Sequence, residues 1–153
     1  QVNASWPNEP INLYGPGTDS GTFDYFTEEV MGESGASRAD YTASEDDNIL
    51  VLGVSRDDNA LGYFGLAYYL ENQDTLKNVS IEGVPASFET GKDGTYPLAR
   101  PLYIYISKAS LERPEVEAFV EYYLETARDT EIVTDVGYIP VTDDDYDAAL
   151  GMF

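Results

Sequence analysis

Residues 14–26, with the sequence YGPGTDSGTFDYF, decide how this chain begins to fold. Residues 11–14 alternate apolar and polar side chains as a strand does, and the Gly-Pro-Gly that follows stops the strand. Apolar side chains then recur at helical spacing, which predicts a helix from about Ser20 to Met31, closed by a glycine. The stretch is therefore expected to form a strand, a turn and a helix in succession.

The first turn of that helix has the composition of an anion-binding site. Asp19 and Ser20 are residue types that cap a helix start, and Gly21 places no side chain over the first unpaired N–H groups. Because a helix N-terminus carries about half a positive charge, an oxoanion can meet the N–H groups of Gly21 and Thr22 there, together with two hydroxyls. The turn matches neither the dinucleotide-binding nor the Walker glycine pattern. From spacing alone, a capped helix whose hydroxyls face water is the simpler interpretation.

Four segments of the chain carry a resemblance to a known family. They occur in the order YGPGTDSGTFDYF, SRADYTASEDDN, NALGYFGLAYY and TYPLARPLYIYIS. In this order they resemble the substrate-binding protein of phosphate ABC transporters, in the branch that carries GPGTDSGTFDYFTE, from about Ile11 to the C-terminal region. The resemblance implies an α/β fold: a three-layer lobe like that of type II periplasmic binding proteins, with a mixed sheet flanked by helices.

The resemblance also implies how the chain is divided. Residues 1–107 are expected to form the phosphate-binding lobe, which is the second lobe of a hinged, two-lobed binding protein. Residues 108–153 are expected to be a C-terminal helical segment that would pack on the first lobe, which is largely missing here. A strand at 101–107 would carry the chain through the hinge. In this shortened form, exchange of the C-terminal segment between two copies would give a homodimer.

Function and location follow from the same resemblance. The complete protein is expected to bind inorganic phosphate and to deliver it to the permease subunits of an ABC transporter. Its expected location is extracellular or periplasmic, with a membrane anchor in an N-terminal segment absent here. The first residues lack the charged and apolar regions of a signal peptide, and no apolar run is long enough to span a membrane.

The predicted phosphate site consists of Asp19, Ser20, Gly21, Thr22 and Arg38. Arg38 is included because a guanidinium can bind phosphate through two parallel N–H bonds. Many relatives have an arginine a few residues ahead of the Ser-Gly-Thr, where this chain has Gly-Pro-Gly, and Arg38 is the candidate replacement, held by Asp19 or Asp40. A surface salt bridge of Arg38 with Asp40 or Glu33 is the alternative. A carboxylate can select phosphate over sulfate, because only phosphate carries a proton, and Asp19 is the local candidate for that role.

The composition excludes several classes of function. The 153 residues include 29 acidic and 8 basic side chains, and the formal charge of −21 argues against nucleic acid and anionic membranes as partners. The absence of histidine and cysteine excludes Ser-His-Asp catalysis, thiolate nucleophiles and zinc sites built from these residues. At about 1 M salt the Debye length falls to roughly 3 Å, so the charge is compatible with phosphate binding on a halophilic surface. An ordinary acidic domain is the alternative.

The pattern also predicts the later elements of the chain. A helix is expected to begin at Ser44 with acids in its first turn, and residues 60–65 are expected to form a buried, central strand. The acidic runs at 45–47 and 143–145 lack the spacing of a calcium loop, so we expect no metal and no cofactor. The other predictions are a short helix at 66–70, an edge strand at 78–82, a loop at 88–97, a strong strand at 101–107, a helix opened by Pro114 and a short terminal helix beginning at about Asp143.

Two other functions stay open. An enzyme acting on phosphoesters or acyl groups would use Ser20 as the nucleophile and Asp19 or Asp24 as the base. No histidine, cysteine or nearby lysine is available to activate that serine, so we predict that the chain is not an enzyme. The second alternative is an acidic surface-interaction domain in which the Ser-Gly-Thr serves only as a helix cap.

Overall fold

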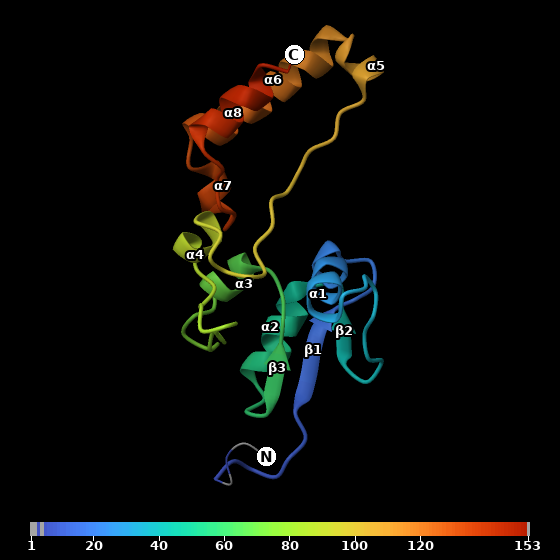
Figure 1. Ribbon diagram of the computed structural model, residues 1–153, viewed down its shortest axis with the longest axis vertical. Helices are drawn as coiled ribbons and strands as arrows, with labels where there is room; N and C mark the ends of the chain where they lie inside the picture. Colours follow the sequence, from blue (N-terminus) through green and yellow to red (C-terminus); the bar gives the residue numbers. More distant parts are fainter. Residues whose placement is uncertain (1–2, 4, 153) are drawn as a thin grey trace. The chain divides into compact units, whose positions relative to one another are not determined.

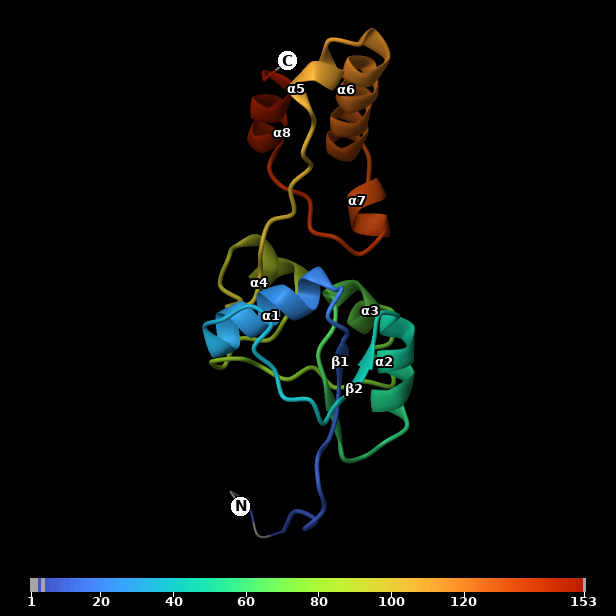
Figure 2. The same cartoon turned by 90° about the vertical axis from the view of Figure 1, so that its right-hand side faces the viewer.

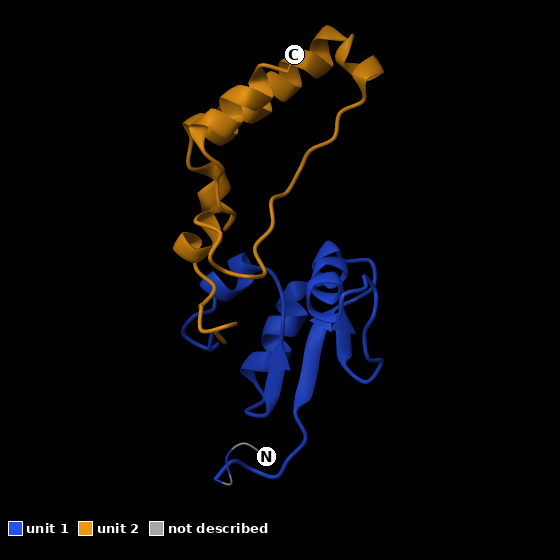
Figure 3. Cartoon of the chain, in the orientation of Figure 1, with its two compact units in different colours: residues 1–78 blue, residues 79–153 orange. Residues whose placement is uncertain are grey.

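The computed structural model describes residue 3 and residues 5–152 and shows two compact units (Figure 1). Unit 1 comprises residues 1–78 and unit 2 comprises residues 79–153 (Figure 3). Unit 1 contains a parallel sheet with helices, whereas unit 2 is helical. The sequence predicts a different division, between a binding lobe at 1–107 and a segment at 108–153 that packs on another lobe. That division stays a prediction.

The sheet of unit 1 has three strands: β1 (Asn12–Pro16), β2 (Thr42–Ser44) and β3 (Ala60–Gly62). Their order is β2-β1-β3, and both pairings are parallel. The strand predicted at 11–14 is therefore confirmed and extends to Pro16. The expectation of a mixed sheet is wrong for this sheet, because a helix follows each of the first two strands and returns the chain to the same direction.

β1, and not β3, is the central strand. β1 has a neighbour on both sides, whereas β3 lies at an edge and is three residues long. Leu61 in β3 is 46% exposed. The prediction of a buried central strand at 60–65 is therefore wrong, because an apolar run alone does not distinguish a central strand from an edge strand. The short helix predicted at 66–70 is confirmed as α3 (Leu66–Leu70).

Two helices cover the two faces of this sheet. α1 (Gly21–Met31) and α2 (Asp47–Ser55) lie on opposite sides of the strands, so unit 1 has three layers (Figures 1 and 2). On the α2 side, Leu50 is fully buried, and Gly53 lies so close to the Tyr14 ring that a Cβ would not fit. The α/β architecture with three layers is thus present in unit 1.

The α1 side is filled by an aromatic pair. The rings of Phe26 in α1 and Tyr63 after β3 are stacked, with centroids 3.9 Å apart and an interplanar angle of 15°. A Cβ at Gly15 would lie 2.7 Å from the Tyr63 ring, so only glycine leaves room for it against β1. Burial raises the pKa of Tyr63 to about 12, with a smaller contribution from Tyr41.

The ends of α1 follow the prediction, whereas the start of α2 does not. α1 begins after Ser20 and ends at Gly32, whose φ of 79° is the left-handed conformation that favours glycine. The N-cap of α2 is Asp46, which accepts a hydrogen bond from the Asn48 N–H at 3.0 Å. The prediction of a helix start at Ser44 is wrong, because Ser44 pairs with β1 as the last residue of β2.

Unit 2 packs around two helices, α6 (Pro114–Asp129) and α8 (Asp143–Leu150). Its core consists of Val120 and Leu124 from α6 and Tyr146 from α8. Pro114 occupies the first turn of α6 as predicted, and the predicted terminal helix is confirmed as α8. The other helices are α4 (Phe88–Lys92), α5 (Lys108–Leu111) and α7 (Ile132–Asp135).

Three predictions in the second half of the chain are wrong. Residues 88–97 are not all loop, because Ser87 and Thr90 form a capping box that starts α4. Residues 78–82 form no edge strand: Ile81 makes a single bridge to Val84 across a tight turn. Residues 101–107 are extended but belong to no strand, because they have no pairing partner within the described chain.

The apolar stripe of α6 is only partly covered. Val120 and Leu124 are buried, whereas Phe119 is 65% exposed and its ring is tilted by 42° from that of Tyr123, with centroids 6.5 Å apart. Within the residues that the structure describes, no helix is both long enough and apolar enough to cross a membrane.

Candidate anion-binding site

The strand order of unit 1 marks one edge of the sheet as the place for a ligand. The chain passes from β1 to β2 on one side and then returns across β1 to β3 on the other side. The connections therefore diverge beyond the carboxyl ends of β1 and β3, and ligands of open parallel sheets bind at such a point. Residues 17–20, which join β1 to α1, lie at this edge.

Ser20 is the N-cap of α1, as the sequence predicts. Its backbone is extended (φ −100°, ψ 128°), and its Oγ accepts a hydrogen bond from the Thr22 N–H at 3.1 Å. The Ser20 N–H donates to the Gly17 carbonyl at 3.2 Å. A hydroxyl has one donor proton and two acceptor lone pairs, so Ser20 can cap the helix and still donate its proton to a ligand.

Gly21 and Thr22 form the first turn of the eleven-residue helix α1. Gly21 is exposed and Thr22 is half-buried. In the part of the chain that the structure describes, the Thr22 hydroxyl makes no hydrogen bond. The turn therefore offers two hydroxyl donors at the positive end of a helix, which is the chemistry that an oxoanion requires.

Glu45 is a neighbour of this turn that sequence reasoning did not single out. Its Oε1 accepts a hydrogen bond from the Asp19 N–H at 3.3 Å, and a Cβ at Gly17 would coincide with the same carboxylate. The Gly17 N–H donates to the Ser44 carbonyl at 3.2 Å, which extends the pairing of β1 with β2 and brings the next residue, Glu45, over the turn. The position of Glu45 could have been predicted from the parallel pairing of β1 and β2, because each strand precedes a helix and the residues after the two strands then lie side by side.

Arg38 is paired with Asp40. Its Nε lies 2.5 Å from Asp40 Oδ1, and its Nη2 lies 2.6 Å from Asp40 Oδ2. The hydrogen bond from Arg38 lowers the pKa of Asp40, and the same bond raises the pKa of Arg38. Both side chains are exposed, and no hydrogen bond or ion pair joins Arg38 to residues 19–22 within the described residues. The exposed Arg38–Asp40 pair agrees with both interpretations of Arg38, including the surface salt bridge, and its role as a ligand stays a prediction.

The turn does not have the geometry of a nucleophile and its base. The Ser20 Oγ is bonded to a backbone N–H, and Asp24 Oδ1 accepts from the Ser34 hydroxyl at 3.3 Å. No carboxylate is bonded to Ser20 among residues 3 and 5–152. Over the same residues, no group of three or more acidic side chains is arranged to hold a metal ion.

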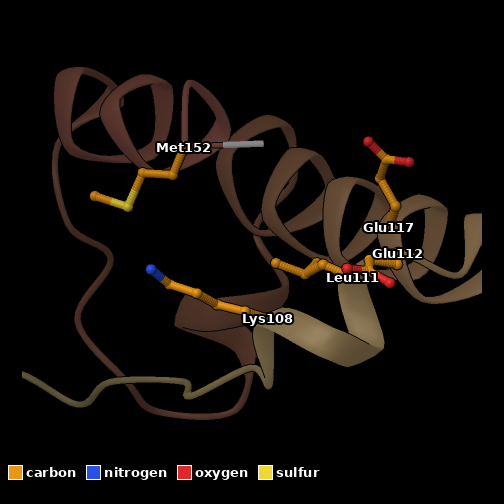
Figure 4. A pocket seen from close by; sticks show the side chains of 5 residues that line it. All are labelled: Lys108, Leu111, Glu112, Glu117 and Met152. Atoms are coloured by element: carbon orange, nitrogen blue, oxygen red, sulfur yellow. The ribbon is translucent and has the colours of Figure 1, made fainter.

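Unit 2 contains a separate surface hollow of about 290 Å³ (Figure 4). It is lined by Lys108, Leu111, Glu112, Glu117 and Met152. Met152 is 79% exposed, and the remaining lining combines one ammonium group with two carboxylates and one leucine. These side chains do not converge on a common ligand atom (Figure 4), so we assign no role to this hollow.

Comparisons with known proteins match nearly the whole chain. The model of the PBP superfamily domain matches residues 3–127. The chain is 45% identical over 159 residues to Protein SphX of Synechococcus elongatus, covering 100% of this chain and 46% of the relative. It is 34% identical over 151 residues to the phosphate-binding protein PstS of Staphylococcus saprophyticus, covering 95% of this chain and 46% of that protein. The chain therefore spans about half the length of these relatives.

Solved structures give the same result. A possible phosphate-binding protein from Planctomyces limnophilus is similar with a TM-score of 0.72 and 43% identity, over 99% of this chain and 55% of that one. A phosphate-binding protein of a phosphate ABC transporter from Streptococcus pneumoniae has a TM-score of 0.65 at 23% identity, over 87% of this chain and 52% of that one, and it supports the fold alone. The expected fold class, a periplasmic-binding-protein-like α/β fold, is confirmed.

Proposed function

Because the chain belongs to the PBP superfamily, among the substrate-binding proteins of phosphate ABC transporters, we propose that it binds inorganic phosphate at the turn between β1 and α1. The observation that carries the proposal is the position of residues 20–22. They place a capped helix start and two hydroxyls at the carboxyl edge of a parallel sheet. The relative that is 45% identical is aligned over this turn as part of the whole chain.

The turn supplies neutral donors to the anion. Ser20 and Thr22 would each donate a hydroxyl proton, while the first turn of α1 supplies backbone dipoles. Gly21 would let the anion approach the backbone, because it has no side chain at this exposed position. No bond is made or broken in this function, and we propose that the protein is not an enzyme.

Arg38 and Asp19 complete the proposed set of binding residues. Arg38 would supply the one cation of the site by exchanging part of its pairing with Asp40 for the phosphate. Asp19 belongs to the turn itself, and its backbone N–H faces the Glu45 carboxylate. Half a cleft binds weakly, so the remaining contacts would come from the rest of the complete protein.

We also propose a location and partners for the complete protein. It would work in the extracellular or periplasmic space, anchored at the membrane, and deliver phosphate to the permease subunits of an ABC transporter. The large excess of acidic side chains supports a surface adapted to molar salt, where screening removes most of the repulsion between them and the ligand. Nucleic acid is not a partner in this proposal.

The C-terminal segment, residues 108–153, has a proposed role in assembly. The exposed side of the α6 stripe, with Phe119 and Tyr123, would pack on the other lobe of the complete protein. When that lobe is absent, two copies would cover these side chains by exchanging the segment, which is a low-cost route to a dimer. Sedimentation of the 153-residue chain at molar salt tests the second statement, and a monomer at all concentrations would contradict it.

Calorimetry tests the proposed function. The complete natural protein, in molar salt, is titrated with phosphate and then with sulfate, and we expect binding with a preference for phosphate. Ser20→Ala and Thr22→Val should each weaken phosphate binding by about tenfold or more, because hydrogen bonds to charged groups contribute roughly 1.5–3 kcal/mol. Ser55→Ala in α2 removes a hydroxyl outside the turn and is the matched control. Absence of phosphate binding would remove the proposal.

A further inference from the structure

We propose that Asn3 is a modification site, the acceptor of an N-linked glycan. The inference goes beyond the proposed function and takes from it only the location of the protein outside the cytoplasm, where such acceptor sites lie in surface loops of secreted proteins. The argument comes from the sequence around Asn3, from the hydrogen bonds of its side chain and from its exposure.

The sequence at 3–5 has the acceptor pattern for N-glycosylation. Asn3 is followed two residues later by Ser5, and the residue between them is not proline. Asn78 and Ser80 repeat the pattern. Asn3 is exposed, whereas Asn78 is half-buried, so only the first of the two asparagines lies at the open surface. A pattern this short also occurs by chance, and the local structure is therefore the stronger part of the argument.

The side chain of Asn3 is in direct contact with the serine of the pattern. Its Oδ1 accepts two hydrogen bonds from Ser5, one from the backbone N–H at 3.0 Å and one from the hydroxyl at 2.8 Å. The Asn3 carbonyl also accepts a hydrogen bond from the Trp6 N–H at 3.2 Å, which closes a turn around the pair. The two side chains that the pattern requires are thus held together as an Asx turn.

This arrangement leaves the amide nitrogen of Asn3 accessible. Because Oδ1 faces Ser5, Nδ2 lies on the other side of the planar amide, and it donates to no acceptor within residue 3 and residues 5–152. Asn3, Ser5 and Trp6 are all exposed, and the turn precedes β1. A transferase can therefore reach the nitrogen without opening the sheet or its helices.

The modification needs a glycosyl phosphate ester as its co-reactant and a transferase outside the cytoplasm. Nδ2 attacks the anomeric carbon of the donor sugar, and a new C–N bond forms there. The C–O bond between that carbon and the phosphate breaks, and the phosphate leaves with the bonding electrons. Nδ2 gives one proton to a base of the transferase, so the product is a neutral N-glycosyl amide.

A glycan on Asn3 is compatible with an anion site between β1 and α1. The segment that contains Asn3 enters β1 at its amino end, whereas the turn before α1 leaves β1 at its carboxyl end (Figure 1). The five residues of this strand span roughly 16 Å, so the strand keeps the two sites apart.

The composition around Asn3 also suits a glycan. Residues 1–8 include no charged side chain, although 24% of the chain is charged, and Trp6 is 61% exposed. A surface hydrated mainly by carboxylates thus leaves one indole without charged neighbours in its own segment. An N-linked glycan is bulky and solubilising, so its hydroxyls would supply the hydration that this segment lacks.

Mass spectrometry of the complete natural protein, isolated from its own cells, tests the inference. We expect the peptide that ends at Glu9 to carry sugar residues on Asn3. Ser5→Ala, produced in the same cells, should remove them because it removes the hydroxyl of the pattern, whereas Ser5→Thr should keep them. Asn8→Gln is the matched control and should leave the glycan unchanged, because Asn8 is also exposed but has Pro10 two residues later.

Phosphate calorimetry on the same wild-type sample separates this inference from the proposed function. An unmodified Asn3, or sugar residues on Asn78 alone, overturns the inference whatever the phosphate result. If such a sample binds phosphate, the proposed function stands without the inference. If Asn3 carries a glycan and the protein binds no phosphate, the proposed function fails and the inference stands.

Discussion

Unit 1 and unit 2 differ in where their extended segments find hydrogen-bond partners. In unit 1, β1 pairs with a strand on each side, and helices cover both faces of the sheet. In unit 2, residues 101–107 are extended without a pairing strand in the described chain, and Tyr105 is 90% exposed. The comparison teaches that the strand pattern of β1 finds its partners within unit 1, whereas the similar pattern at 101–107 finds no partner in the described chain.

The largest expected effect is unfolding at low salt, and it should affect both units. Acidic side chains outnumber basic ones in each unit, and the ion pairs of Arg38, Arg113 and Arg128 compensate only part of this excess. At low salt the repulsion between carboxylates should therefore unfold the chain. We expect circular dichroism to show loss of helix at low salt and its recovery in molar KCl. Helix content that does not change with salt would contradict the halophilic interpretation.

The next effect compares one leucine from each unit. Leu50 in α2 is fully buried, whereas Leu102 in the extended segment is 63% exposed. Leu50→Ala should lower the free energy of unfolding by about 2–5 kcal/mol. Leu102→Ala in the same 153-residue chain should change it by less than about 0.5 kcal/mol. Urea unfolding in molar salt measures both, and a large loss for Leu102→Ala would show that residues 101–107 are packed in solution.

One helix cap from each unit gives a smaller effect. Ser20 caps α1 in unit 1, and Thr142 caps α8 in unit 2 with a capping box completed by Asp145. Ser20→Ala and Thr142→Ala should each lower the free energy of unfolding by about 1 kcal/mol, because each leaves an N–H group without its partner. Only Ser20→Ala should also weaken phosphate binding. Equal losses of affinity in both variants would mean that the effect at Ser20 comes from stability alone.

The smallest effect is a pH dependence confined to unit 1. Burial raises the pKa of Tyr63 to about 12, above the ordinary value of about 10, so the folded state keeps this proton longer than the unfolded state does. Its contribution to stability is therefore present below about pH 10 and is lost as the pH rises through 12. Tyr63→Phe keeps the stacked ring and should flatten the fall of the urea midpoint over this range. An unchanged slope would assign the alkaline loss to other tyrosines.

The sequence predicted those parts of the fold that local signals determine. Ser20 as a cap, Gly32 as a helix end and Pro114 as a helix start all act within one turn of chain, and all three are confirmed. Ser44 misled the prediction because a residue suited to capping also fits a strand end. Its role is decided by pairing with β1, which lies far away in the sequence.

The segments that failed are those whose state depends on a distant partner. Residues 101–107 have a strong strand pattern, but a strand exists only where another backbone pairs with it. The same reason hid Glu45, because its place beside the turn follows from the parallel register of β1 and β2 and not from spacing along the chain. The residues of the turn could be predicted together because Ser-Gly-Thr is contiguous, and their role in binding stays a prediction.

The stacked rings of Phe26 and Tyr63 link α1 to the chain that follows β3, at the edge of the sheet where the strands of unit 1 end. One ring belongs to α1 and the other follows β3, and the bare backbone of Gly15 leaves room for the Tyr63 ring against the central strand. The stacking thus joins α1 to the chain that follows β3. A displacement of the chain after β3 would therefore move α1 through the stacked rings, and the N-terminus of α1 at Ser20 would change its position as well.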